Sequence, residues 1–198
     1  MNKLKRNALL ALLLTAVAVP AVAQYSEGYT FLKAVRERNG AKATSIVSNP
    51  GSTAINARER GTGEAGLHIV TRGRDLGWVN FLLARGARPD IQDEAGNTPL
   101  IVAAQIGFYE AAEQLLARRA NVNLSNSRGE TPLIFAVQQR NIAMVGLLLA
   151  NGADPSRADS VAGYSAIDYA RRDNRAGPIL RLLQAPQRRA PQLMGPSR

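Results

Sequence analysis

Apolar positions along this chain recur every 33 or 34 residues. One ladder steps through Leu67, Leu100, Leu133 and Ile167. A leucine pair follows 15 residues behind each of these, at 82–83, 115–116, 148–149 and 182–183. Alanines mark the ends of the units at Ala87, Ala120 and Ala153. Self-similarity at a fixed period is the signature of a solenoid, in which successive units stack on one another.

The unit over residues 93–125 predicts a turn followed by two helices. Residues 93–97 are turn-forming, and Thr98 suits an N-cap because its hydroxyl can accept a free backbone N–H. Pro99 suits the first helical position, and Gly107 can end that helix in a left-handed conformation. A second helix is expected over 109–117, with its leucine pair on the buried side.

Neither predicted helix is long enough to be stable alone, because isolated helices below ~12–15 residues are marginal in water. Each pair must therefore pack against the neighbouring pairs, as in other repeat arrays. Small residues at Ala103, Ala104, Ala136 and Ala170 would let helices of adjacent units approach closely. The pattern predicts a linear, all-α stack.

These motifs resemble the ankyrin repeat. Units 93–125 and 126–158 match its turn, Gly, Thr-Pro-Leu, Ala, Leu-Leu and Gly-Ala pattern closely. Unit 60–92 has Ala65-Gly66 in place of Thr-Pro, unit 159–184 keeps Gly163 and Ala170, and 28–59 aligns as a degenerate cap. The resemblance implies an ankyrin-repeat α-solenoid over 24–184. It would have about five repeats of paired antiparallel helices joined by β-turn or hairpin loops.

Two arginines depart from this pattern. Arg119 stands where Gly86 and Gly152 stand in other units, and Arg140 stands where Gly107 does. If these helix ends are left-handed, a side chain there costs about 0.5–1 kcal/mol. Replacing Arg119 with glycine is therefore expected to raise the melting temperature.

Residues 1–23 have the form of a secretory signal peptide. A basic start with Lys3, Lys5 and Arg6 precedes a 12-residue apolar run over 8–19, and small residues end at Ala23. The run is shorter than the ~20 residues of a membrane-spanning helix, which disfavours an uncleaved anchor. Cleavage after Ala23 would leave a mature chain without a transmembrane segment. The expected location is the periplasm of a Gram-negative cell or the secreted fraction, and eukaryotic secretion stays open.

The chain is basic, and the excess charge gathers at its C-terminal end. The formal charge of +10 falls to +7 without the first 23 residues, and residues 171–198 carry +6. Residues 185–198, which contain three prolines, predict a disordered tail. No nucleic-acid-reading module accompanies this charge, so a solubilising role or weak contact with an anionic surface is favoured over nucleic-acid binding. The chain has no cysteine, which excludes thiol chemistry and disulfides.

Motifs for chemistry are scarce, so the sequence predicts no enzyme, no cofactor and no metal. His68 is the sole histidine, and the resemblance implies a structural role in tying adjacent turns together. Residues 61–66 spell Gly-x-Gly-x-x-Gly, but the buried strand that a dinucleotide site requires does not precede them. Trp78 aligns with packed positions and is expected in the core.

The resemblance implies that a partner protein binds the concave face formed by turn tips and first helices. Transferring positions by register gives a candidate surface of ten residues: Glu94, Asn97, Gln105, Ile106, Arg128, Glu130, Gln138, Gln139, Tyr164 and Arg172. Tyrosine and arginine are enriched in binding hot spots. We therefore expect a monomeric, non-enzymatic scaffold, inhibitor or stabiliser of another protein. The alternative is an effector or envelope-surface binder that acts through its basic tail.

Overall fold

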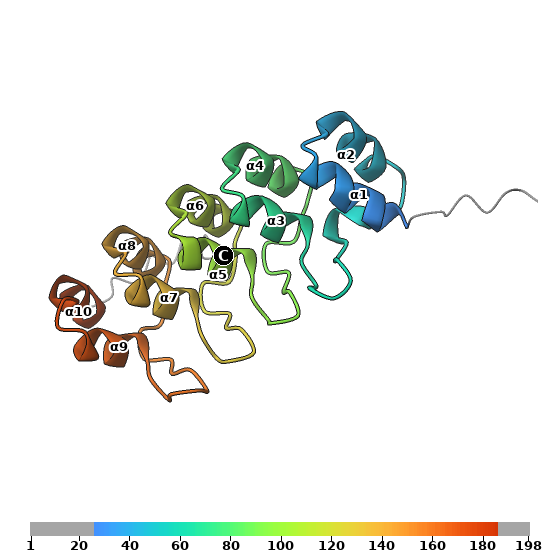
Figure 1. The fold of residues 1–198 in the computed structure, drawn as a ribbon. Helices are drawn as coiled ribbons and strands as arrows, with labels where there is room; N and C mark the ends of the chain where they lie inside the picture. Colours follow the sequence, from blue (N-terminus) through green and yellow to red (C-terminus); the bar gives the residue numbers. More distant parts are fainter. Residues whose placement is uncertain (1–25, 186–198) are drawn as a thin grey trace, which may run out of the picture.

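The computed structural model describes residues 26–185, which form five helix pairs in a row (Figure 1). The first helices of the pairs are α1 (Glu27–Arg36), α3 (Gly66–Arg72), α5 (Pro99–Ile106), α7 (Pro132–Gln138) and α9 (Ala166–Arg172). The second helices are α2 (Gly40–Val47), α4 (Leu76–Ala84), α6 (Tyr109–Ala117), α8 (Ile142–Ala150) and α10 (Gly177–Gln184). A short 3-10 helix, η1 (Ala54–Asn56), follows the first pair.

The helices form two layers, one of first helices and one of second helices. Each first helix packs on its own partner and on the first helix of the next pair, as α5 does on α6 and α7. The loops that lead into α3, α5, α7 and α9 project below the layer of first helices (Figure 1). No strand longer than an isolated bridge occurs in residues 26–185, so the all-α prediction is confirmed.

Side-chain caps explain where these short helices begin. The Thr98 hydroxyl accepts the N–H of Ile101 at 3.2 Å, and Thr131 does the same at the start of α7. Proline occupies the first position of both helices, where no backbone hydrogen bond is lost. Asn141 caps α8, and Asn39 caps α2 in the same way. The degenerate first unit therefore keeps the local chemistry of the regular ones.

The core is continuous along the stack and follows the sequence ladders. Leu67, Leu100 and Leu133 are each at most 1% exposed. The first member of each of the leucine pairs at 82, 115 and 148 is fully buried. The small alanines expected between first helices are also buried. Trp78 is half-buried and packs edge-on against Phe81, in agreement with the predicted core role.

Four arginines adopt the left-handed conformation at helix ends. Arg119 has φ 63° and Arg140 has φ 52°, which confirms the expectation for both positions. Arg38 and Arg74 share this conformation and were not predicted to do so. Backbone strain of this kind persists in a native structure where surrounding contacts hold it in place.

Three of these arginines connect one pair to the next. The guanidinium of Arg38 pairs with Asp75, and that of Arg140 pairs with Asp173. Arg74 donates to the carbonyl of Ile106 at 2.7 Å. Each contact thus joins the end of a first helix to the same corner of the following repeat. The Arg119 side chain makes no hydrogen bond or ion pair within residues 26–185, and its backbone N–H donates to Leu116 at 2.9 Å.

None of the helices in residues 26–185 combines the length and apolarity needed to cross a bilayer. The expected signal peptide and all but Ala185 of the expected tail, 185–198, lie outside the described residues.

Candidate protein-binding surface

Four loops, here called the fingers, project from the layer of first helices. They comprise residues 58–65, 91–98, 124–131 and 157–165, and they precede α3, α5, α7 and α9 respectively. Antiparallel bridges between Arg58 and Ala65, and between Ala158 and Ser165, close the first and last of them. We call the finger face the surface made by the fingers together with the exposed sides of the first helices.

Backbone hydrogen bonds join the fingers in one direction. The N–H of Glu94 donates to the carbonyl of Thr62 at 3.0 Å. The N–H of Ser127 donates to Ala95 at 3.0 Å, and that of Ser160 donates to Arg128 at 2.8 Å. Every later finger is therefore held against the one before it. This ladder fixes the spacing of side chains along the finger face.

The buried side chain of His68 contacts the backbone of the first two fingers. Its Nδ1 accepts the N–H of Ala65 at 3.1 Å, and its Nε2 lies 2.9 Å from the carbonyl of Asn97. Nε2 must carry the proton for both contacts to be hydrogen bonds. Burial lowers the pKa of His68, although the Asn97 contact opposes this shift, so the ring is neutral near pH 7. The predicted structural role of His68 is confirmed by this geometry.

The ten predicted surface residues differ in how accessible they are. Glu94, Arg128, Gln138, Gln139 and Arg172 are exposed, whereas Asn97, Gln105, Ile106 and Tyr164 are half-buried. Ile106 packs against the core and therefore presents less apolar surface than its position suggested. The Asn97 amide donates to Asp93 and accepts from Asn126, so it links two fingers.

Glu130 is not the accessible residue that the register predicted. It is 8% exposed, and its carboxylate accepts hydrogen bonds from Asn126 at 2.9 Å and from Arg128 at 2.9 Å. The physical reason is the tight turn of the third finger, which folds Asn126 and Arg128 back over the carboxylate. Glu130 therefore orients Arg128 and is removed from the set of candidate contacts.

An aromatic cluster with one arginine stands at the last repeat. The Arg172 guanidinium lies 4.4 Å from the centre of the Tyr164 ring, and Tyr164 meets the Tyr169 ring edge-on at 5.6 Å. The Tyr169 hydroxyl donates to the Asp159 carboxylate at 2.7 Å. Tyr169 and Asp159 were missed by sequence reasoning, because a hydrogen bond across ten residues of a hairpin leaves no periodic signal.

Asp159 is itself held by its own finger. Its second carboxylate oxygen accepts the N–H groups of residues 161, 162 and 163. Burial raises its pKa, but the Tyr169 hydroxyl and these N–H groups outweigh that effect and lower it. The same hydrogen bond raises the pKa of Tyr169 to about 12. The two rings and Arg172 are thus fixed in place before any partner arrives.

The arrangement offers binding but no constellation for catalysis in the described part of the chain. No group of three or more metal-binding side chains occurs in residues 26–185. Gly61 and Gly63 of the Gly-x-Gly-x-x-Gly spelling lie in the first finger, and Gly66 opens α3. Their surroundings are a hairpin loop and not the strand-to-helix turn that cradles a pyrophosphate.

Stacked helix pairs with projecting fingers define an α-solenoid repeat protein. The family model described as ankyrin repeats, in three copies, matches residues 67–159. The chain contains ankyrin repeats, and its fold is the ankyrin-repeat α-solenoid. Ankyrin repeats generally mediate protein–protein interaction.

Proposed function

We propose that this chain is a non-enzymatic binding protein that holds a partner protein against its finger face. The observation that carries the proposal is the rigid row of fingers, joined by backbone hydrogen bonds, that ends in the cluster of Tyr164, Tyr169 and Arg172. A surface fixed before binding loses little conformational entropy when a partner docks. Such a surface is suited to tight and selective protein recognition.

The third and fourth fingers supply the strongest candidate contacts. Ser160 donates its N–H to the Arg128 carbonyl, so Arg128 adjoins the finger that carries Tyr164. Exposed Gln138 lies on α7, which packs against α9 and its Arg172. Tyrosine and arginine dominate interface hot spots because they combine large contact area with directional hydrogen bonding. This end of the finger face therefore carries most of the proposed affinity.

The proposal includes export. The signal-like residues 1–23 support a periplasmic or secreted protein that acts as a monomeric scaffold, inhibitor or stabiliser of another protein there. Fractionation of cells that express the whole sequence tests this. The expected product is a chain that starts at Gln24 in the periplasm or medium, identified by N-terminal sequencing. A full-length cytoplasmic chain would contradict it.

Site-specific photocrosslinking tests the binding face. A photoreactive residue at Gln138, on the finger side, is expected to capture one dominant protein. The same residue at Glu113, an exposed position on second helix α6, serves as the matched control and should capture none. Arg172→Glu should abolish capture at Gln138 while leaving the melting curve near that of the wild type. Equal capture from both positions would contradict the proposal.

A second candidate function uses the basic end of the chain. Residues 171–198 carry a charge of +6, and among the described ones Arg175 and Arg181 are exposed without an ion pair in residues 26–185. These charges favour weak contact with an anionic envelope surface. Deleting residues 186–198 separates the two functions. A finger-face binder keeps its crosslinked partner, whereas a tail-driven binder loses both binding and its dependence on salt.

A further inference from the structure

The first finger, residues 58–65, differs from the later ones because it donates no backbone hydrogen bond to another finger of residues 26–185. The fingers lead into α3, α5, α7 and α9, and the first of them hangs below α1 in this view (Figure 1). The first finger therefore forms the open end of the ladder of backbone hydrogen bonds. In each later finger, the N–H of one residue closes the hairpin, and the N–H of the next residue donates to the preceding finger. In the second finger these two residues are Asp93 and Glu94.

Arg60 occupies this donor position in the first finger. It follows Glu59, whose N–H closes the hairpin by donating to Glu64. The N–H of Arg60 donates to no acceptor within residues 26–185. The Arg60 side chain is exposed and makes no hydrogen bond or ion pair in the described chain. Arg60 thus carries both a backbone N–H and a positively charged side chain that have no partner within residues 26–185.

A concavity of about 680 Å³ lies between α1 and the start of the first finger. It is lined by one side of α1 and by the start of the first finger, including Gly28, Leu32, Arg36, Ala57 and Arg60. Leu32 is 3% exposed and supplies an apolar floor. A Cβ at Gly28 would lie 2.7 Å from the Ala57 side chain, so glycine permits the close contact that forms one wall.

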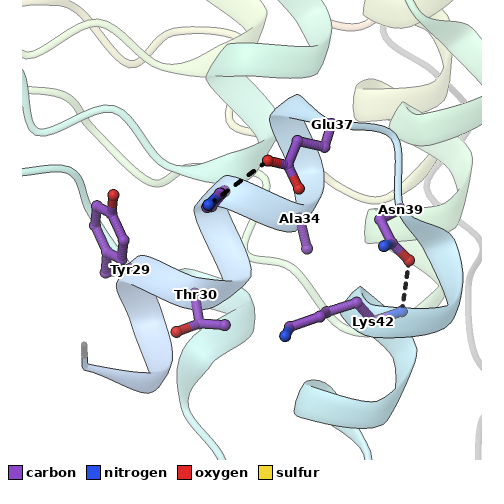
Figure 2. Close-up of a pocket in the computed structure, with 7 residues that line it drawn as sticks. Tyr29, Thr30, Ala34, Glu37, Asn39 and Lys42 are labelled. Atoms are coloured by element: carbon purple, nitrogen blue, oxygen red, sulfur yellow. Dashed lines mark hydrogen bonds and ion pairs between the residues drawn. The ribbon is translucent and has the colours of Figure 1, made fainter. Parts of the chain in front are cut away.

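The charges around this concavity are positive on balance. Arg36 pairs with Glu59 at 2.6 Å, and Arg58 donates to the Gly63 carbonyl at 3.1 Å. Arg58 and Arg60 therefore both lack an ion pair within residues 26–185, and the Arg60 side chain also lacks a hydrogen bond there. A neighbouring hollow of about 420 Å³ at the end of the stack is different in kind (Figure 2). There Lys33 pairs with Glu37, and Asn39 caps α2 by accepting the Lys42 N–H.

We propose that this open finger edge binds an extended acidic segment of a partner protein, which lies along the first finger as each later finger lies along the one before it. A carbonyl of the segment accepts the Arg60 N–H, and a carboxylate pairs with the Arg60 guanidinium. Adding an extended peptide to an open backbone edge is a general mode of recognition. The site does not depend on the proposed binding at the finger face and would stand if that proposal failed.

Selection from a random library of 12-residue peptides displayed on phage tests the specificity. The bait is the protein purified from cells that express the whole sequence. We expect recovered peptides to be rich in Asp and Glu, and at least tenfold fewer to bind Arg60→Glu. Arg157→Glu makes the same charge change in the last finger, at the other end of the stack, and should bind like the wild type. No enrichment, or equal loss with both variants, overturns the proposal.

Amide hydrogen exchange measured by NMR, with the best recovered peptide as probe, tests the geometry. Exchange at the Arg60 amide should slow at least tenfold when the peptide binds, while the Arg157 amide stays unchanged. Binding without protection of Arg60 overturns the proposed edge pairing. Protection of Arg60 in the free protein would assign the site to the chain's own residues 1–25, or to a second copy if sedimentation shows concentration-dependent dimers. Either result overturns a partner segment as the occupant.

Discussion

The α3–α4 repeat and the two central repeats, α5 to α8, share one backbone plan but differ in the chemistry beneath the first helix. The central repeats begin α5 and α7 with a threonine cap and a proline, and they place Ile101 and Ile134 in full burial. The α3–α4 repeat has Ala65 at the cap and His68 at the isoleucine position. It also has Thr71 where the central repeats have Ala104 and Val137.

The two polar residues of the α3–α4 repeat are buried to the same extent but satisfied differently. His68 and Thr71 are both 0% exposed. His68 makes two hydrogen bonds, one of them to the next finger, whereas the Thr71 hydroxyl has no partner in the structure. His68 offsets the cost of its burial by hydrogen bonding to the backbone at the start of α3 and to the next finger. The Thr71 hydroxyl has no such compensation, so its burial should destabilise the fold. Stability measurements should separate these two cases.

The largest effect is expected from His68→Ala. This change removes two hydrogen bonds and leaves a cavity in a fully buried position, so the free energy of unfolding should fall by about 2–4 kcal/mol. Urea titration followed by circular dichroism measures it. Gln105→Ala, on the equivalent helix but half-buried, should cost under about 1 kcal/mol. Similar losses for both variants would contradict a specific role for His68.

The dependence of stability on pH should follow from His68 as well. Because burial lowers the pKa of His68, the unfolded chain takes up a proton near pH 6.5 before the folded chain does. The free energy of unfolding should therefore decline as pH falls below about 6.5, with a slope of up to ~1.4 kcal/mol per pH unit. His68→Ile should be flat from pH 7 down to about 4.5. Asp159, Asp168 and Asp173 have lowered pKa values, so their contributions are lost only below about pH 4.

Thr71→Val should change stability in the opposite direction to His68→Ala. Valine has the shape of threonine and occupies the equivalent position 137, so the change removes an unsatisfied hydroxyl without opening a cavity. We expect a gain of about 1 kcal/mol in the free energy of unfolding. Thr98→Val is the matched control, because it deletes the N-cap of α5 and should cost about 1 kcal/mol. A loss for both variants would show that Thr71 has a partner in solution.

The smallest expected effect concerns the left-handed arginines. Arg119→Gly should raise the free energy of unfolding by about 0.5–1 kcal/mol, since glycine adopts positive φ without strain and the Arg119 side chain makes no hydrogen bond or ion pair within residues 26–185. Arg140→Gly relieves the same strain but removes the pair with Asp173, so its gain should be smaller or absent. Thermal melts of the two variants side by side measure the difference. A larger gain for Arg140→Gly would contradict the connecting role of its side chain.

The repeating parts of this fold could be predicted from the sequence because each is specified locally. Thr98, Pro99 and Gly107 mark the limits of α5, and the left-handed positions of Arg119 and Arg140 follow from glycine at equivalent sites. Contacts between repeats were not predictable in this way. The reach of Arg74 to Ile106 depends on how far one repeat is displaced from the next. The burial of Glu130 depends on how its finger folds over it, which register alone does not describe.

The backbone hydrogen bonds between fingers all run in the same direction, from each later finger to the one before it. The two interior fingers both accept from the following finger and donate to the preceding one, so a further 33-residue copy placed between the central units would find both neighbours already complementary. Neither terminus would need a compensating change. Gain or loss of a repeat by recombination could therefore change the length of the interior of this array. The two terminal repeats lack a neighbouring finger on one side within the described chain, so they would evolve under different constraints.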